Sequence, residues 1–432
     1  MIATEGMWCC ETDLSGDGRI RSVAPQEPGH ATARVLVRLH GEPLGYVTLP
    51  AVDGDVDRGQ LLRMVWARWS GDVNEHLAVE GLPALTALRP ADVPLAPATT
   101  ACPNHVEADE PVSVVVCTHN RSSILPRCLA GLQALTYPKL EIVIVDNAPS
   151  DGSTRAVVEK VMAADERFRY VVEPRAGLSY ARNKGLATAS GTYLAYTDDD
   201  VSVDPGWIEG LVRGFRRRPD IGCVTGLVCT ASVNTAAEAY FDARASSWST
   251  RPRPEIFDMH GARREGALYP YSAGIYGTGA NFAFDREFLT GTHGFDEALG
   301  AGARTRGGED LDAFVTTLLE GRAIAYEPSA IVWHHHRAGH DELLRQLYGY
   351  GTGFAAFIAK TIARPSTRWD VVQRVPQGLG KIVKIRSDTR HALGGEIESP
   401  RGAALVEFAG YAAGPYLYWR ARRDHRKLMR KP

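Results

Sequence analysis

The sequence has 432 residues, of which 44% are hydrophobic and 23% are charged, the proportions of an ordinary globular protein with one to three domains. Its 49 Lys and Arg against 51 Asp and Glu give a formal net charge of −2, and the missing basic excess argues against a nucleic-acid partner. Seven cysteines at irregular spacings, with no CxxC pair, indicate a reducing compartment rather than a disulfide framework.

The first part of the chain predicts a small separate unit. Residues 1–30 have neither the charged start nor the apolar core of a secretory signal, and we expect them to be partly disordered. Residues 33–49 alternate apolar and polar side chains around a turn, which predicts two strands, and residues 58–81 carry apolar side chains at helical spacing. We therefore assign residues 1–87 to an α+β accessory domain and the Pro- and Ala-rich residues 88–111 to a linker.

From residue 112 onward, apolar runs alternate with helical periodicity. The runs VSVVVCT, LEIVIVDN and TYLAYTD are typical of strands buried on both faces, so the pattern predicts a parallel sheet covered by helices. Ligands of such sheets bind beyond the carboxyl ends of the strands. Polar side chains follow the three runs at that edge: Thr118, His119, Asn120, Asp146, Asn147 and Asp198 to Asp200.

The three consecutive carboxylates of Asp198, Asp199 and Asp200 need a specific explanation. Crowded carboxylates repel one another and raise one another's pKa. Mg²⁺ or Mn²⁺ relieves this repulsion, since both prefer oxygen ligands such as carboxylates together with substrate phosphates. A metal that joins Asp198 or Asp200 to a diphosphate is one interpretation, and a solvated acidic turn before the next helix is the other.

Six stretches decide between these interpretations. In chain order they read VSVVVCTHNR, LEIVIVDNAPSDGS, GLSYARNKGLATASGTYLAYTDDD, GTGANFAFDR, GFDEALG and GGEDLDAFVTTLLEGRAIAYEPSAIVWHHHR. Together they resemble the family 2 glycosyltransferases with the GT-A fold, over residues 112–340. The resemblance implies an α/β catalytic domain with a Rossmann-like nucleotide-binding sheet. It also implies inverting transfer of a sugar from a nucleotide-diphosphate sugar to an acceptor hydroxyl.

The resemblance implies a divalent metal, Mn²⁺ or Mg²⁺, at the DXD positions. Asp198 and Asp200 are expected to bind it, and Asp199 to orient the loop. A histidine beyond the base completes the metal site in several relatives; we choose His334, with His336 as the alternative because both lie on one side of an extended segment. A cation there stabilises the charge that develops on the departing diphosphate.

The resemblance also implies the general base and the substrate contacts. Asp310 takes the place of the base, with Glu309 beside it, and a positioned base contributes about 10²–10⁴-fold in rate. Asp146 can accept a hydrogen bond from a uracil ring or a ribose, although an Asx turn explains it as well. The expected donor contacts are Thr118, Asn120, Arg121, Asp146, Arg182, Asn183, Asp198 and Asp199. The expected contacts to the donor sugar or the acceptor are Gly279, Ala280, Asn281 and Trp333.

Residues 341–432 predict a helical extension whose end is basic, from Arg420 to Lys431. This end either docks peripherally on an anionic membrane or packs on the catalytic domain as a solvated helix. No apolar run is long enough to span a membrane, and we expect a cytoplasmic protein, on the inner face of the membrane if the end docks.

Two other functions compete with glycosyl transfer. A sugar-phosphate nucleotidylyltransferase also pairs a nucleotide-binding sheet with metal-binding acids, but it needs a Gly-rich basic loop after the first strand, which CTHNRSSILPRCL lacks. A catalytically inactive nucleotide-sugar-binding module is the other, and Asp200, Asp310 and His334 argue against it. The donor nucleotide stays open between uridine and dTDP, and the acceptor between a glycan, a lipid-linked glycan and a natural product.

Overall fold

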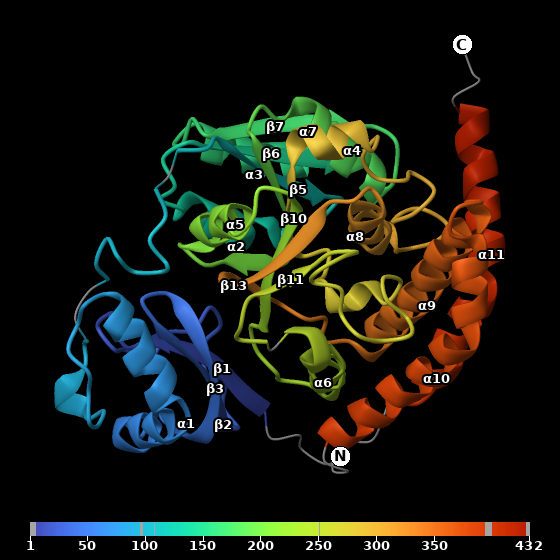
Figure 1. Cartoon of the computed structure of the whole chain (residues 1–432). Coiled ribbons are helices and arrows are strands. Elements are labelled where there is room, and N and C mark those ends of the chain that lie inside the picture. The colour runs from blue at the N-terminus through green and yellow to red at the C-terminus, as the bar shows by residue number, and fades with distance from the viewer. Residues whose placement is uncertain (1–5, 96–97, 108, 250, 394–399, 429–432) are drawn as a thin grey trace.

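The computed structural model describes residues 6–95, 98–107, 109–249, 251–393 and 400–428. In Figure 1 a small N-terminal sheet with its helix lies on one side of a larger α/β body, and the long C-terminal helices lie on the opposite side. The predicted fold class is confirmed: the protein is mixed α/β with a central sheet and a helical C-terminal region.

The N-terminal sheet contains two strands that the sequence did not predict, the first and the last. Its elements are β1 (Gly6–Asp13), β2 (His30–Leu39), β3 (Glu42–Val52) and β4 (Asp55–Val56), followed by helix α1 (Arg58–Val79). The first two strands pair in parallel, and β2 and β3 form the predicted hairpin. Residues 1–30, which we expected to be partly disordered, include the regular strand β1, where Cys9 and Cys10 are buried and supply apolar contacts.

Two ion pairs, one buried and one partly buried, hold the N-terminal sheet against the larger body. Arg38 Nη1 donates to Asp204 Oδ2 at 2.6 Å, and Arg34 Nη2 donates to Asp242 Oδ1 at 2.7 Å. Both arginines come from β2. Removing one partner of such a pair leaves a buried charge uncompensated, so these contacts fix where the sheet sits.

Within the described residues, nine strands build the central sheet. They are β5 (Val112–Thr118), β6 (Leu140–Asn147), β7 (Phe168–Glu173), β8 (Tyr193–Asp198), β9 (Val201–Val203), β10 (Ile221–Thr230), β11 (Glu255–Phe257), β12 (Asn281–Asp285) and β13 (Ala323–His334). The order is β11-β13-β10-β12-β8-β5-β6-β7, with β9 paired to β13. The β8-β5-β6-β7 half is parallel; in its register Thr118 faces Asp146 and Cys117 faces Asp198, so these strands end together at one edge.

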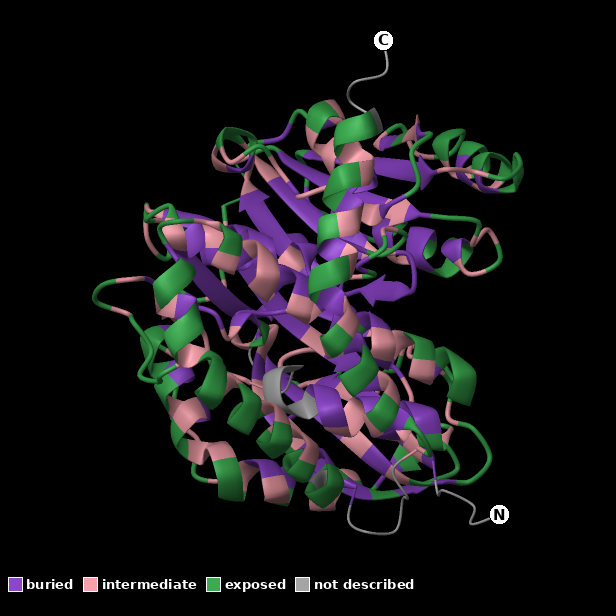
Figure 2. Ribbon diagram, turned by 90° about the vertical axis from the view of Figure 1, so that its right-hand side faces the viewer, coloured by how far each residue is buried: buried purple, intermediate pink, exposed green. Residues whose placement is uncertain are grey.

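Helices cover both faces of this sheet. They are α2 (Leu125–Gln133), α3 (Ser153–Met162), α4 (Leu178–Thr188), α5 (Trp207–Arg216), α6 (Ala236–Ser249), α7 (Arg286–Gly291) and α8 (Glu309–Leu319). One face packs against α2, α3 and α5, and the opposite face against α4, α7 and α8. Figure 2 shows the buried strands between these layers. Two 3-10 turns, Pro90–Asp92 and Ala273–Ile275, complete the described elements.

The C-terminal region consists of α9 (His340–Ala363), α10 (Arg368–Ala392) and α11 (Ala403–Leu428). Helix α9 runs unbroken through its glycines, because these allow close packing on α11: a Cβ atom on Gly351 would lie 2.4 Å from Glu407 O, and one on Gly410 would lie 2.6 Å from Tyr348 O. Among the described helices, none combines the length and the apolar character that crossing a membrane requires.

Candidate active site

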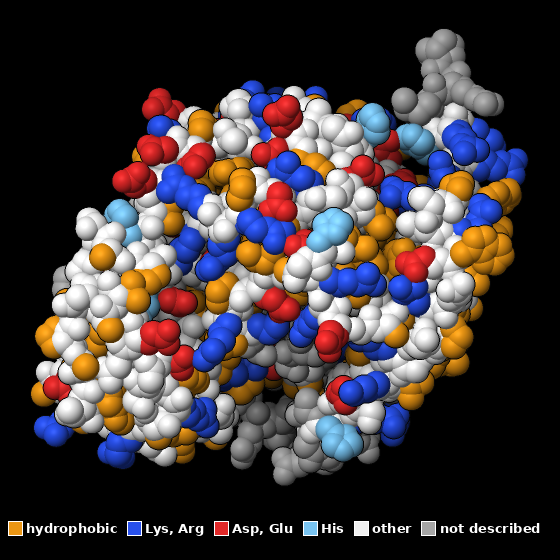
Figure 3. Space-filling view, in the orientation of Figure 1, with side chains coloured by type: hydrophobic (Ala, Val, Ile, Leu, Met, Phe, Trp, Pro, Cys, Tyr) orange, Lys and Arg blue, Asp and Glu red, His pale blue; other side chains and the backbone are white. Residues whose placement is uncertain are grey.

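A cavity of about 1910 Å³ opens at the carboxyl edge of β5 and β8 and extends along α8 to the C-terminal helices. Its wall includes Asp200, Asp310 and His334, which come from three distant parts of the chain. In Figure 3, charged and histidine side chains mix with hydrophobic ones on the face between the central sheet and the C-terminal helices. The three residues that the predicted chemistry needs therefore share one cavity.

Asp198, Asp200 and His334 form the group that can hold a cation. One ligand atom from each lies within 4.8 Å of the others, and His334 Nε2 is 3.4 Å from Asp200 Oδ1. Backbone pairing fixes this approach: β9 brings Val201 opposite His334, and His335 N donates to Asp200 O at 3.0 Å. Two carboxylates and an imidazole are a donor set that suits Mn²⁺. The residues present fit a divalent cation.

Asp199 does not belong to the cation group; its side chain contacts the loop after β5. Its Oδ2 accepts from the Thr118 hydroxyl at 2.7 Å, and its Oδ1 accepts from Arg121 Nη1. Arg121 Nη2 also donates to Asp200 Oδ2 at 3.0 Å. Asn120, in the left-handed region at φ 52°, accepts at Oδ1 from the Ser150 amide at 2.9 Å. Thr118 and Arg121 thus tie the β5 loop to the acidic turn, and Asn120 ties it to the segment after β6.

The three acids differ in their proton affinity. Burial raises the pKa of Asp198 to about 8 and neighbouring carboxylates add to this, although its side chain is 34% exposed and Arg182 opposes the shift. Burial raises the pKa of Asp199 to about 6 against the charge of Arg121. Burial acts in the same direction on Asp200, but His334 and Arg121 outweigh it and lower the pKa of this residue. A cation would be the missing counter-charge for Asp198.

The predicted base lies in the first turn of α8. This turn begins at Gly308, which has φ 91° and no room for a side chain, because a Cβ atom there would lie 2.4 Å from Gly353 O of α9. Asp310 lies on the cavity wall, and its Oδ1 accepts from the Leu311 amide at 2.8 Å. Asp312 points away and accepts from Lys360 Nζ at 2.7 Å. Asp310 is thus the carboxylate that α8 presents to the cavity beside the buried Glu309.

Arg182 connects these groups. Its Nη1 donates to Glu309 Oε1 at 2.9 Å, its Nη2 donates to Gly279 O at 2.9 Å, and its Nη2 lies 3.7 Å from Asp198 Oδ1. Burial raises the pKa of Glu309 to about 7 although Arg182 opposes the shift. Glu309 Oε2 is buried without a hydrogen-bond partner among the described residues. Gly279 and Ala280 line the cavity, and their contact with a sugar stays a prediction.

Two residues that were assigned to the sugar lie elsewhere. The Asn281 amide is fully buried: Nδ2 donates to Leu227 O at 3.0 Å and Ala330 O at 2.8 Å, and Oδ1 accepts from Trp207 Nε1 at 2.8 Å. Trp333 packs in an apolar cluster on the side of the N-terminal sheet. Neither lies on the cavity wall, so the structure corrects the assignment of both to the sugar.

Three predicted donor contacts also lie off the cavity wall: the exposed Asn120, and Asn183 and Asp146 behind the wall. Asn183 donates from Nδ2 to Phe295 O at 2.9 Å and accepts from the Phe295 amide at 2.8 Å, so it holds a loop and not a ligand. Asp146 is fully buried, and its Oδ2 accepts from the Tyr170 hydroxyl at 2.6 Å. Its Oδ1 has no hydrogen-bond partner among the described residues, and burial raises its pKa. A donor contact for Asp146 therefore stays a prediction.

Sequence reasoning missed the far wall of the cavity. Apolar and basic side chains of the C-terminal helices form it: Ile358, Ile362, Val371, Arg374, Val375, Leu379, Lys381, Lys384 and Phe408. The helical period predicts these helices, but it does not show which face turns toward a cavity. No local motif marks this wall.

Comparison with known proteins identifies the domain. Residues 113–290 match the model of Glycosyl transferase family 2. The succinoglycan biosynthesis protein ExoM of Rhizobium meliloti is 31% identical over 52% of this chain and 66% of its own length. The pre-mycofactocin glycosyltransferase of Mycobacterium tuberculosis is 28% identical over 57% of this chain and 47% of its own. The chain spans less than half the length of several such relatives.

Among solved structures, the mannosyltransferase PcManGT of Pyrobaculum calidifontis in complex with GDP-Man and Mn²⁺ has a TM-score of 0.45 and 19% identity, and covers 76% of this chain and 89% of its own. This likeness is partial, and the assignment rests on the family model and the curated relatives. Residues 113–290 therefore form a glycosyl transferase family 2 domain.

Proposed function

We propose that this protein moves a sugar, with inversion, from a nucleotide-diphosphate sugar to a hydroxyl of an acceptor. The observation that carries the proposal is the shared cavity of Asp200, His334 and Asp310. The proposed reaction uses a metal-binding group and a carboxylate that can act as a base, and both line this cavity. The family of residues 113–290 agrees with this chemistry.

Asp198, Asp200 and His334 would hold the divalent cation, Mn²⁺ or Mg²⁺. When bound, the cation would stabilise the charge on the departing diphosphate. Arg121 now neutralises Asp199 and Asp200 from the solvent side, and its guanidinium can turn to a phosphate when the donor arrives. Thr118 and Asn120 hold the loop that carries Arg121 in place.

Asp310 would take the proton of the acceptor hydroxyl. Its Oδ2 would lie 3.0 Å from a Cβ atom built on Gly279, so the small residues at 279 and 280 leave the base open to a sugar. Arg182 and Glu309 lie behind it and position the turn. The base and the cation site are separate groups on the cavity wall. The acceptor hydroxyl can therefore attack the reacting carbon on one side while the diphosphate leaves on the other, as in-line displacement requires.

The far wall supports an amphiphilic acceptor. It combines the apolar Ile358, Val371 and Leu379 with the basic Arg374 and Lys384. Apolar side chains favour a hydrocarbon or aromatic group, and the basic ones favour an anionic group such as a phosphate. A lipid-linked acceptor joins both features, so we favour it over a free glycan.

Peripheral contact with a membrane fits such an acceptor. Trp369, Leu379 and Val383 of α10 are 70%, 59% and 64% exposed, and Leu405 of α11 is 76% exposed. Exposed apolar residues next to basic ones favour anionic lipid surfaces. We expect the protein to float with anionic vesicles, and we expect Trp369→Ser with Val383→Ser to weaken flotation without loss of donor hydrolysis.

A donor panel tests the proposed reaction. The protein is incubated with UDP-, dTDP- and GDP-sugars and Mn²⁺, and slow release of the nucleoside diphosphate is measured. We expect release with one donor class, none with EDTA, and none with Asp200→Asn. Release that does not depend on metal contradicts the proposed site. Pyrophosphate formed from a nucleoside triphosphate and a sugar phosphate would indicate the nucleotidylyltransferase, and donor binding without turnover would indicate an inactive module.

A further inference from the structure

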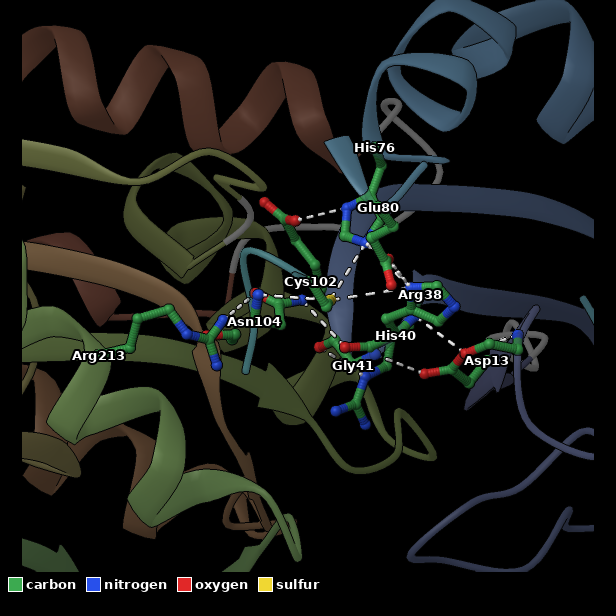
Figure 4. A network of polar contacts seen from close by, with 12 residues as sticks. Asp13, Arg38, His40, Gly41, His76, Glu80, Cys102, Asn104 and Arg213 are labelled. Carbon is green, nitrogen blue, oxygen red and sulfur yellow. Dashed lines mark hydrogen bonds and ion pairs between the residues drawn. The ribbon is translucent and has the colours of Figure 1, made fainter. Parts of the chain in front are cut away.

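Four metal-ligating side chains converge in the N-terminal part of the chain, away from the cavity. His40 lies in the turn between β2 and β3, His76 and Glu80 lie one helical turn apart at the end of α1, and Cys102 comes from the linker. Figure 4 shows the four side chains pointing toward one another. All four are buried, and the His40 and Glu80 side chains are fully inaccessible to solvent.

Their ligand atoms form a compact group. His40 Nδ1 lies 3.0 Å from His76 Nε2, and Glu80 Oε1 lies 2.5 Å from His40 Nδ1 and 3.0 Å from His76 Nε2. Cys102 Sγ lies 3.5 Å from His76 Nε2 and 3.8 Å from His40 Nδ1. Zinc binds nitrogen at about 2.0–2.1 Å and sulfur at about 2.3 Å, so two ligands of one tetrahedral ion lie roughly 3–4 Å apart.

We propose that His40, His76, Glu80 and Cys102 form a structural zinc site. The set contains one thiolate, two imidazoles and one carboxylate, all common zinc ligands, and four protein ligands close a tetrahedral site. The imidazoles would bind through His40 Nδ1 and His76 Nε2. Binding releases the Cys102 thiol proton to solvent, since the thiolate is the ligand.

Outer contacts orient these ligands as zinc sites require. His76 Nδ1, the nitrogen that would not bind the ion, lies 3.2 Å from Glu42 Oε2. Glu80 Oε2 accepts from the Thr99 amide at 2.7 Å, which leaves Oε1 toward the cluster. A carboxylate on the far nitrogen of a ligating histidine is a recurrent feature of metal sites. Cys102 Sγ accepts from the Asn104 amide at 3.4 Å, a contact that favours a thiolate.

The site joins three parts of the chain. Cys102 brings the linker to the end of α1 and to the His40 turn, and Asn104 Nδ2 donates to His40 O at 3.0 Å. Arg213 of α5 donates to Asn104 Oδ1, so the linker also contacts the central body. Zinc at this position would hold the linker between the N-terminal sheet and α5. It would therefore act on the arrangement of the two units and not on the chemistry at Asp200.

The metal content of the full chain tests this proposal. The protein is expressed in zinc-supplemented medium, dialysed without chelator and analysed by inductively coupled plasma mass spectrometry. We expect about one tightly held zinc ion per chain, in keeping with a closed four-ligand site. Asp200→Asn should keep this zinc, which separates it from any ion at the Asp198 site. A folded wild-type chain that contains no zinc and takes none up overturns the proposal.

Variants and a spectrum identify the ligands. Cys102→Ser and His76→Gln should lose the zinc, whereas His105→Ala, an exposed histidine three residues beyond Cys102, should keep it. If the ligand variants fail to fold, the wild-type chain remains testable: Co²⁺ exchanged into it should give the visible absorption of a tetrahedral site and a sulfur-to-cobalt charge-transfer band. Zinc retained by Cys102→Ser, or a cobalt spectrum without the sulfur band, would contradict this ligand set.

Discussion

Arg182 Nη1 donates to Glu309 Oε1 at 2.9 Å, and this buried contact joins α4 to the first turn of α8. The same guanidinium donates to Gly279 O and lies 3.7 Å from Asp198 Oδ1. One side chain therefore touches the turn of the base, the small-residue loop and an acid of the cation site. Among the described residues, Arg182 is the only one that forms ion pairs with both Asp198 and Glu309.

Replacing Arg182 with Ala should destabilise the fold. Above pH 7, where Glu309 is ionised, it would lose its buried counter-charge, and breaking one side of a buried ion pair costs about 3–5 kcal/mol. The free energy of unfolding in urea measures this loss. Arg21→Ala is the matched control, because Arg21 pairs with Asp17 through side chains that are 60% and 42% exposed, and exposed pairs contribute about 0–1 kcal/mol. Equal losses in the two variants would contradict the role given to Arg182.

Replacing Asp310 with Asn should slow the chemical step. The amide cannot take the acceptor proton, so kcat should fall by about 10²–10⁴-fold while donor KM changes little. Steady-state kinetics with donor and acceptor measure this split.

Asp312→Asn, two residues along α8, is the control for Asp310→Asn. It weakens the contact with Lys360 and should cost about 1–3 kcal/mol of stability with kcat near that of the wild type. If Asp312→Asn lost as much activity as Asp310→Asn, the helix and not the base would explain both.

His336 should tune the cation site without binding the ion. Its Nδ1 lies 2.9 Å from His334 Nδ1, and its Nε2 lies 3.0 Å from Thr230 Oγ1. His336→Phe keeps the ring contact with Phe241, whose centroid is 4.4 Å away, but removes both nitrogens. Outer partners of metal ligands contribute about 10–100-fold in affinity, so Mn²⁺ should bind more weakly by that factor.

Isothermal titration with Mn²⁺ measures the affinity, and His335→Phe serves as the control. His335 Nε2 lies 3.0 Å from Ser202 Oγ and takes no part in the cation group, so its variant should bind Mn²⁺ as the wild type does. Unchanged affinity in His336→Phe would show that His334 needs no support from this ring.

The parts of the site that sequence reasoning predicted share a physical reason. Asp198 is the last residue of strand β8 and Asp200 lies two residues beyond it; parallel strands end at a common edge, so a short sequence pattern determines their position. His334 ends β13, which pairs in parallel with β10. The grouping of Asp198, Asp200 and His334 follows from these strand ends, as the resemblance implied.

Sequence reasoning misplaced residues whose burial depends on contacts with segments far away in the chain. Eleven of the twelve residues of β13 are buried, so period and hydrophobicity cannot tell which face a residue such as Trp333 occupies. The N-terminal sheet covers that face, about 300 residues earlier in the chain. The proposed zinc ligands also come from distant segments. Only His76 and Glu80 are close enough in sequence to form a recognisable motif, and Cys102 lies 62 residues from His40.

The buried carboxyl group of Glu309 should make stability depend on pH. Its pKa is raised by burial to about 7 in the folded state from an ordinary value of 4.5. Between these values the folded state holds a proton that the unfolded state releases, so the free energy of unfolding should fall as the pH rises from about 4.5 to 7, by on the order of 1–3 kcal/mol. The stabilisation is complete below pH 4.5 and is lost above pH 7.

Unfolding in urea at pH 5, 6 and 7.5 measures this dependence, with Glu309→Gln as the test variant. Gln keeps an oxygen for Arg182 but has no proton to lose, so the fall between pH 5 and 7.5 should be smaller than in the wild type. Glu287→Gln, at an exposed position in α7, should leave the wild-type slope unchanged, because its carboxylate stays in water in both states. Equal slopes in all three proteins would mean that Glu309 is already ionised at pH 5, held by Arg182 against the effect of burial.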